Sequence, residues 1–360
     1  MAFSLNWGRF YSRYWLSLRY GLRLNKPILI VRLAYNYLRL LTGLGPLIRS
    51  VDFAPTYKCN LKCEHCFASD LEDESRPKMT LNDYGRVAKE ARKLGAIHFA
   101  FQGGEPTILP ELEDLIKAIS PSRSLVSITT NATTLDVGRI KKIKKLGVDI
   151  LTVSLDSSLP KEHDSFRGAI GTHQKAIDTI DNALAQGLSV CINTMVSHQN
   201  INESGFRGLV DYTRKKGIKI NVLLPAPVGR WVGNFSSMLD IEDQKTLKAL
   251  MEKNPHIRRD LDANYLHYGC GAMKESIYIS CYGDVLPCPY IHASIGNVLE
   301  EPLRSIWERG LKLDVFKKYH PVCLAEEDMR FIDEHLTPIE KYGSKPAPIG
   351  FLEEGESKAK

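Results

Sequence analysis

The sequence predicts an α/β protein: a partial (βα)6 TIM-like barrel followed by a small C-terminal cysteine-rich α+β module. Three observations indicate this fold. Strand-like and helical stretches alternate from residue 52 onward. Glycines fall where the helices are expected to end, as C-terminal caps often do. A second group of cysteines follows the alternating region, which sets the last part of the chain apart.

Six runs rich in β-branched and aromatic residues are expected to be strands: 52–57, 97–102, 125–130, 150–155, 188–196 and 218–224. Five helical patterns lie between them: 80–94, 110–119, 135–146, 172–186 and 203–216. Such alternation predicts a parallel sheet. If the sheet curls into a partial barrel, functional side chains gather at the carboxyl ends of its strands.

The chain divides into five expected segments. They are a basic amphipathic helical arm (1–50), the partial barrel (51–225), connecting helices (226–264), the cysteine-bearing module (265–330) and an extended tail (331–360).

Charge is concentrated in the arm. Residues 1–50 carry eight Arg or Lys and no acid, whereas the remaining 310 residues hold 40 basic and 42 acidic groups. Because basic and acidic groups nearly balance in residues 51–360, this part of the chain is not expected to bind nucleic acid. The chain shows neither a signal peptide nor the ~18 uninterrupted apolar residues of a membrane span, so a cytoplasmic location is expected.

The arm is expected to form two short helices, broken at Asn25-Lys26-Pro27. Its aromatic and aliphatic residues alternate with arginines, a composition suited to the membrane interface. We therefore expect peripheral contact with the inner membrane face through residues 1–45. The alternatives are a helical cap packed against the barrel and an organellar presequence.

Three cysteines follow the first predicted strand: Cys59, Cys63 and Cys66. Thiolates on a tight loop can hold three irons of a [4Fe–4S] cluster and leave the fourth open to a chelating ligand. A zinc site is the main alternative, with His65 as a strained fourth ligand. The second alternative is that the three thiols are inert and bind no metal.

The loop resembles the C-x3-C-x2-C motif of the radical SAM superfamily, and the resemblance runs from about Phe53 to Leu224. It implies that His65 packs on the adenine of S-adenosylmethionine and that Gly103-Gly104-Glu105-Pro106 binds the amino group. It also suggests contacts from Asn131, Ser154 and Arg167, the last two toward the ribose and carboxylate. Each feature alone has a simpler explanation: a glycine turn, a helix cap at Asn131, or a surface ion pair at Arg167.

The resemblance implies reductive cleavage of S-adenosylmethionine to a 5′-deoxyadenosyl radical, which then removes a hydrogen atom from a substrate. It also implies oxidoreductase-type chemistry and an electron donor such as flavodoxin or ferredoxin. No general acid or base is assigned.

The C-terminal module is expected to contain a β-hairpin turning at Tyr282-Gly283. It resembles the opening half of a SPASM domain, and the shortened pattern implies one auxiliary [4Fe–4S] cluster. Four cysteines are candidate ligands, with Cys281 the weakest: Cys270, Cys281, Cys288 and Cys323. A zinc site or a lost cluster is the alternative. Cys191 is expected to be a core thiol.

The substrate is constrained less well than the chemistry. The arm suggests a lipid or isoprenoid at the membrane surface, and other small molecules remain open. The alternative enzymes are a peptide maturase and a sugar- or haem-pathway enzyme. The non-enzymatic alternatives are an iron–sulfur electron-transfer protein and a zinc-stabilised interaction module.

Overall fold

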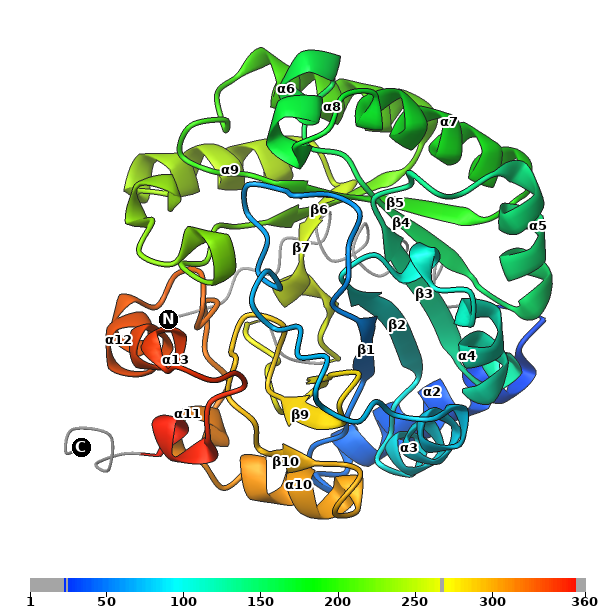
Figure 1. Cartoon of the computed structure of the whole chain (residues 1–360), viewed down its shortest axis with the longest axis vertical. Coiled ribbons are helices and arrows are strands. Elements are labelled where there is room, and N and C mark those ends of the chain that lie inside the picture. Colours follow the sequence, from blue (N-terminus) through cyan, green and yellow to red (C-terminus); the bar gives the residue numbers. More distant parts are fainter. Residues whose placement is uncertain (1–22, 24, 266–268, 354–360) are drawn as a thin grey trace.

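The computed structural model describes residues 23, 25–265 and 269–353. A single ten-stranded sheet organises them, in the order β10-β9-β8-β1-β2-β3-β4-β5-β6-β7 (Figure 1). Six neighbouring strands pair in parallel, as the alternation predicted. They are β1 (Ser50–Thr56), β2 (His98–Gly103), β3 (Leu125–Thr130), β4 (Ile150–Ser154), β5 (Ser189–Met195) and β6 (Lys219–Leu223).

The helices between these strands cover the outer side of the curved sheet (Figure 1). They are α3 (Leu81–Lys93), α4 (Leu112–Ala118), α5 (Val137–Leu146), α6 (Pro160–Arg167), α7 (Thr172–Ala185) and α8 (Ser204–Lys216). Thr80 begins α3 with a capping box, and Gly147 ends α5 in the left-handed conformation. The partial-barrel prediction is therefore confirmed. The helix α6 and two short 3-10 turns, Pro106–Ile108 and Pro121–Arg123, were not expected.

The sheet extends beyond the six expected strands at both edges. β7 (Ile257–Arg259) continues it in parallel beside β6, within a segment where only helices were expected. That segment also holds the expected helix α9 (Ile241–Lys253). β8 (Ser276–Ile279) adds in parallel to β1, so the C-terminal module continues the sheet.

The expected hairpin is present in the module. β8 pairs antiparallel with β9 (Asp284–Leu286), and Gly283 turns between them at φ +88°. β10 (Gly296–Asn297) and α10 (Leu303–Gly310) follow, with α11 (Asp314–Lys317) after them. A positive φ in this turn favours glycine.

The segment after residue 328 differs from the expected extended tail. It forms α12 (Met329–Phe331), a π-helical turn (Ile332–Leu336), α13 (Thr337–Lys341) and a 3-10 turn (Ile349–Leu352). Three apolar side chains at helical spacing, Ile332, Leu336 and Ile339, are fully buried. The Pro, Gly and charged residues around them hid this short apolar period.

The described part of the arm contains one helix, α2 (Pro27–Leu41), which starts at the predicted break. The first expected helix falls outside the described residues. Within the part of the chain that the structure describes, no helix has the length and apolar character needed to cross a membrane.

Candidate iron–sulfur and cofactor site

The three-cysteine loop leaves the carboxyl end of β1, and its thiols influence one another electrostatically. Burial, followed by the nearby Glu105 carboxylate and the Cys63 and Cys66 thiols, raises the pKa of Cys59 to about 11. The pKa of Cys66 is also raised, again first by burial and then by Cys63. A cationic metal centre reverses this resistance to ionisation, because thiolates bind it directly. The set therefore fits an iron–sulfur cluster.

The turn after β2 packs directly against this loop. The Gly104 N–H donates to the Thr56 carbonyl at 2.8 Å, and the Glu105 N–H donates to the Lys58 carbonyl at 2.9 Å. A Cβ on Gly104 would lie only 2.2 Å from the Lys58 oxygen, and Gly103 adopts φ +115°. The two glycines thus allow a backbone approach that a side chain would prevent.

Glu105 is almost completely buried beneath this turn, and its carboxylate joins two strand ends. Oε1 accepts hydrogen bonds from the Thr107 N–H at 3.0 Å and the Thr130 hydroxyl at 2.8 Å. Oε2 accepts from the Asn131 N–H at 2.6 Å. Burial raises the pKa of Glu105 and these bonds oppose the rise. The carboxylate is held rigidly near the cysteine loop.

Asn131 is more than a helix cap. Its Nδ2 donates to Asn60 Oδ1 at 3.0 Å and lies 3.8 Å from the Cys59 sulfur. Its Oδ1 accepts from the Thr133 N–H at 3.0 Å. The structure therefore brings the end of β3 to the cysteine loop.

Arg167 forms a buried ion pair rather than a surface one. Its Nε donates to Asp156 Oδ2 at 2.6 Å, and its Nη1 lies 3.8 Å from the Cys63 sulfur. Burial opposes ionisation of Asp156, but Arg167 and His163 more than offset it and lower its pKa. Burial likewise opposes the Arg167 charge, yet Asp156 and Cys63 raise its pKa. The guanidinium is a fixed positive charge beside one cysteine of the loop.

His65 stacks on Phe166, with the ring centroids 4.7 Å apart and the planes at 8°, and Trp231 lies against it at 5.9 Å. Burial first, and then Arg167, lower its pKa to about 3, so the ring is neutral. Its Nδ1 is buried and has no hydrogen-bond partner among the described residues. A stacked neutral ring with an unsatisfied buried nitrogen fits a purine base, whose edge offers both hydrogen-bond donors and acceptors.

Residues Gly229–Trp231, a 3-10 turn after β6, complete the site and were not predicted. The Arg230 N–H donates to the Cys66 carbonyl at 3.0 Å, and its Nη1 donates to the Lys62 carbonyl at 2.9 Å. A Cβ on Gly229 would lie 2.3 Å from the Cys66 oxygen. The only signal in the sequence was a glycine within the connection after the last expected strand.

The module brings three of its cysteines together. The Cys323 thiol shares a hydrogen bond with the Cys270 sulfur, which lowers the pKa of Cys270 and raises that of Cys323. Burial raises the pKa of Cys288, and Cys270 adds to the rise. The Cys323 N–H donates to Glu327 at 2.9 Å, which fixes the loop that carries it.

Cys281, which the sequence made the weakest candidate for a fourth ligand, packs apart from these three thiols. It packs in a separate cluster with Ala54, Tyr57 and Tyr278. Burial raises its pKa to about 11, and Lys78 opposes the rise. The two cysteines lie at different places on the hairpin: Cys281 follows β8 and clusters with Ala54 of β1, whereas Cys288 lies beyond β9.

Replacing Cys281 with Ala should therefore leave the iron content unchanged at about eight irons per chain, two [4Fe–4S] clusters. The matched Cys270→Ala variant should fall to about four irons, because it removes a clustered thiol. Iron and sulfide analysis of anaerobically reconstituted protein measures both. Equal iron loss in the two variants would return Cys281 to the ligand set.

Comparison with known proteins agrees with this geometry. The Radical SAM superfamily model matches residues 53–213, and the SPASM model, described as an iron-sulfur cluster-binding domain, matches residues 270–325. A "Probable GTP 3',8-cyclase" of Methanosarcina mazei is 31% identical over 315 residues, which cover 79% of this chain and 91% of that protein. A protein of the same name from Methanocella arvoryzae is 32% identical over 184 residues, covering 51% of this chain and 59% of that protein.

A solved structure shares the fold. Streptococcus suis SuiB bound to S-adenosylmethionine superposes with a TM-score of 0.61 at 19% identity, covering 76% of this chain and 69% of SuiB. The barrel, the cysteine loop and the second thiol group define an iron–sulfur enzyme that uses S-adenosylmethionine, with an auxiliary cluster. The chain belongs to the radical SAM superfamily and carries a SPASM domain.

Proposed function

We propose that this enzyme removes a hydrogen atom from a polar, anionic small molecule held on the inner face of the partial barrel. Cys59, Cys63 and Cys66 hold the catalytic cluster in this proposal, and Cys270, Cys288 and Cys323 hold the second. Contacts to S-adenosylmethionine come from residues at the carboxyl ends of the strands: His65, Gly103, Gly104, Glu105, Asn131, Ser154 and Arg167.

A continuous polar row on the sheet carries the proposal about substrate. The strand register aligns Ser154 of β4 with Asn193 of β5, Asn221 of β6 and Arg258 of β7. Asn221 Nδ2 donates to Asn193 Oδ1 at 3.1 Å, and Arg258 Nε donates to Asn221 Oδ1. The row leads from the proposed cofactor contact Ser154 to a cation at the edge of the parallel sheet.

The neighbouring row shows which face this is. One residue earlier on each strand, the same register aligns Val153, Ile192, Ile220 and Ile257. All four belong to the main hydrophobic core, which the covering helices share. Since successive strand residues point to opposite faces, the polar row lies on the inner face.

Arg258 gives this row an unbalanced positive charge. It is only partly buried, and the ion pairs of the described residues leave it without a carboxylate, unlike its neighbour Arg259, which pairs with Glu326 and Glu327. An arginine fork suits a carboxylate or phosphate. Two relatives carry the name "Probable GTP 3',8-cyclase", and GTP is a polar, anionic molecule.

The polar row favours such a molecule over the lipid or isoprenoid that the arm suggested. A hydrocarbon chain on this face would leave the amides of Asn193 and Asn221 and the Arg258 charge poorly solvated, which is costly. A modified peptide remains the second candidate, because its backbone could hydrogen-bond to the same amides.

When bound there, the cluster and S-adenosylmethionine would together supply the one-electron chemistry that removes a hydrogen atom from the substrate. In this proposal, flavodoxin or ferredoxin supplies the electron. The residues of this chain bind and orient. Glu105 and Asn131 fix the turns around the cysteine loop, His65 packs on the base, and the polar row positions the substrate.

The test measures 5′-deoxyadenosine formed by the anaerobically reconstituted enzyme with a chemical reductant. Aqueous extracts of cells lacking the gene should stimulate its formation, and organic-phase extracts should not. Stimulation by the organic phase alone would contradict the polar-substrate proposal. Absence of any cleavage, with both clusters loaded, would contradict the enzymatic proposal itself.

Arg258→Gln should weaken this stimulation about 10- to 100-fold, because a charge-assisted bond to the substrate contributes about 1.5–3 kcal/mol. Basal cleavage without extract should be unchanged. Arg304→Gln, an exposed arginine on α10, is the matched control and should behave as the unmodified enzyme does. Equal responses of the two variants would remove Arg258 from the substrate site.

A further inference from the structure

Helix α2 is fixed to the end of the barrel opposite the cysteine loop (Figure 1). Lys26, directly before it, donates to the carbonyls of Ser124 at 2.9 Å and Gly147 at 2.8 Å, which precede β3 and β4. Asn36 is buried and donates to the Gly95 carbonyl at 2.6 Å, ahead of β2. These contacts lie at the amino ends of the strands, and they hold α2 in one orientation.

The outward side of α2 is an apolar stripe left open to solvent. Its members recur three or four residues apart and are 47–74% exposed: Ile28, Val31, Tyr35, Leu38, Leu41 and, just after the helix, Leu44. The opposite side supplies the buried residues Leu29 and Asn36. Contiguous exposed apolar surface of this kind marks an interaction site rather than a scatter of single residues.

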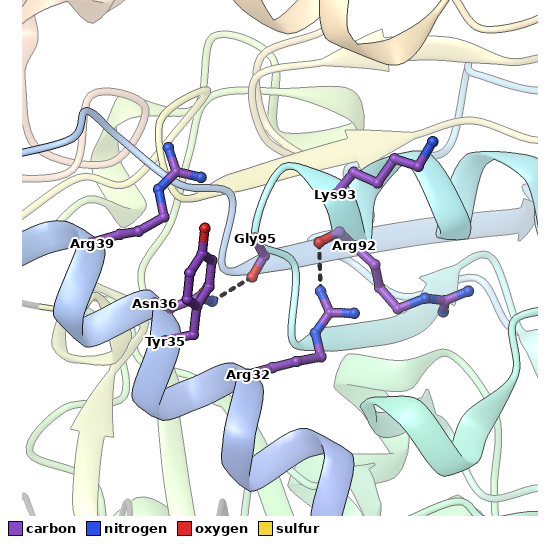
Figure 2. A pocket seen from close by; sticks show the side chains of 7 residues that line it. All are labelled: Arg32, Tyr35, Asn36, Arg39, Arg92, Lys93 and Gly95. Atoms are coloured by element: carbon purple, nitrogen blue, oxygen red, sulfur yellow. Dashed lines mark hydrogen bonds between the residues drawn. The ribbon is translucent and has the colours of Figure 1, made fainter.

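A cationic pocket opens beside the stripe, between α2 and the end of α3 (Figure 2). Its volume is about 250 Å³, and none of its lining residues is acidic: Arg32, Tyr35, Asn36, Arg39, Arg92, Lys93 and Gly95. Tyr35 belongs to both the pocket and the stripe.

The polar contacts of the pocket leave part of its charge available. Arg32 donates to the carbonyls of Arg92 at 2.5 Å and Ala96 at 3.0 Å, and Arg39 donates to Leu44 at 3.1 Å. Burial, and then the positive charges of Arg32 and Arg123, lower the pKa of Arg92 to about 10. Cations crowded in this way are stabilised by an anion.

We infer that the stripe and pocket together form a docking surface for an anionic lipid bilayer. Apolar side chains of a surface helix enter the boundary between headgroups and acyl chains, and basic residues at its edge hold anionic headgroups. The pocket at the edge of the stripe places Arg39 and Lys93 at headgroup level.

The positive charge of the pocket favours an anionic bilayer over two other occupants, the N-terminal residues 1–22 and a second copy of the chain. Residues 1–22 carry three arginines and no acid, so covering the pocket with them would bring like charges together. A second copy docking through the same face would place one cationic pocket near another. An anionic bilayer instead neutralises the pocket, and also suits the rest of the basic arm.

The position of this docking surface on the barrel indicates what role the membrane has. Because α2 lies at the amino ends of the strands, docking leaves the cysteine loop, which follows the carboxyl end of β1, at the other end. Membrane attachment and a polar substrate are therefore compatible, and the bilayer serves as a location rather than a source of substrate. This inference is independent of the proposed function.

Flotation of the full-length, cluster-loaded protein on vesicles tests the inference. We expect binding to phosphatidylcholine vesicles that contain phosphatidylglycerol and none to phosphatidylcholine alone. The Arg39→Gln/Lys93→Gln double variant should bind about 30-fold more weakly, since each basic residue near the surface contributes about 1 kcal/mol. The Leu38→Ser/Leu41→Ser double variant should also lose binding, which would show that the apolar stripe takes part in it.

Two control substitutions use matched exposed residues of α9: Ile241→Ser and Lys248→Gln. Both should float normally, and every variant should retain basal 5′-deoxyadenosine formation. Failure of the unmodified protein to float, or equal binding to neutral vesicles, would overturn the inference. So would a dimer in light scattering that the Leu38→Ser/Leu41→Ser change dissociates, because a second copy would then occupy the stripe.

Discussion

A Cys63→Ala variant is expected to lose the catalytic cluster and with it reductive cleavage of S-adenosylmethionine. Cys63 supplies one of only three thiols in its loop, and its sulfur also faces the buried Arg167 guanidinium at 3.8 Å. Removal of a ligand should cost more than the about 10–100-fold that loss of a supporting contact costs. Iron analysis should fall from about eight to about four irons per chain, and 5′-deoxyadenosine should become undetectable.

The matched control is Cys191→Ala, which removes a buried thiol in β5 far along the chain from both cysteine groups. It should retain both clusters and basal cleavage. Retention of 5′-deoxyadenosine formation by Cys63→Ala would contradict the assignment of the loop. Loss of both clusters in that variant would point to unfolding, which circular dichroism detects.

The parallel barrel was predictable because each of its strands and helices has a recognisable local sequence pattern. The runs at 125–130 and 203–216 match β3 and α8 within one residue, since apolar periodicity and glycine caps act over short distances. β7 was missed because a three-residue strand has no period of its own. Its place in the sheet depends on pairing with β6, which is a tertiary effect.

In the candidate site, too, the features set by local sequence were predictable and those set by tertiary contacts were not. The cysteine loop and the Gly-Gly-Glu turn were visible because their residue types and spacing carry the chemistry directly. The contact from Arg230 was not, since its guanidinium donates to backbone carbonyls of the loop, which every residue type offers, from more than 160 residues away. Cys281 illustrates the converse: spacing counts cysteines but does not show which face of a hairpin each one occupies.

Gly104→Ala is expected to disable the site without removing any ligand. The added Cβ would meet the Lys58 oxygen at 2.2 Å and the Tyr57 carbonyl carbon at 2.6 Å, and both are backbone atoms that cannot rotate away. The turn and the cysteine loop must therefore separate, breaking the bonds from Gly104 and Glu105 to Thr56 and Lys58. Overpacking costs about 1–3 kcal/mol, so we expect cleavage activity to fall by about 100-fold.

The control for this change is Gly343→Ala, because its Cβ would meet nothing within 4 Å and its backbone is not left-handed. It should match the unmodified enzyme in iron content, thermal unfolding and 5′-deoxyadenosine yield. Gly104→Ala should instead lose much, but not all, of the catalytic-site iron while the auxiliary cluster persists, since Cys270, Cys288 and Cys323 lie in a different part of the fold. An unchanged yield would mean that the close approach of the two turns is not needed to hold the cluster. A variant with normal iron but weaker binding of S-adenosylmethionine would place the effect of the clash on the cofactor rather than on the thiols.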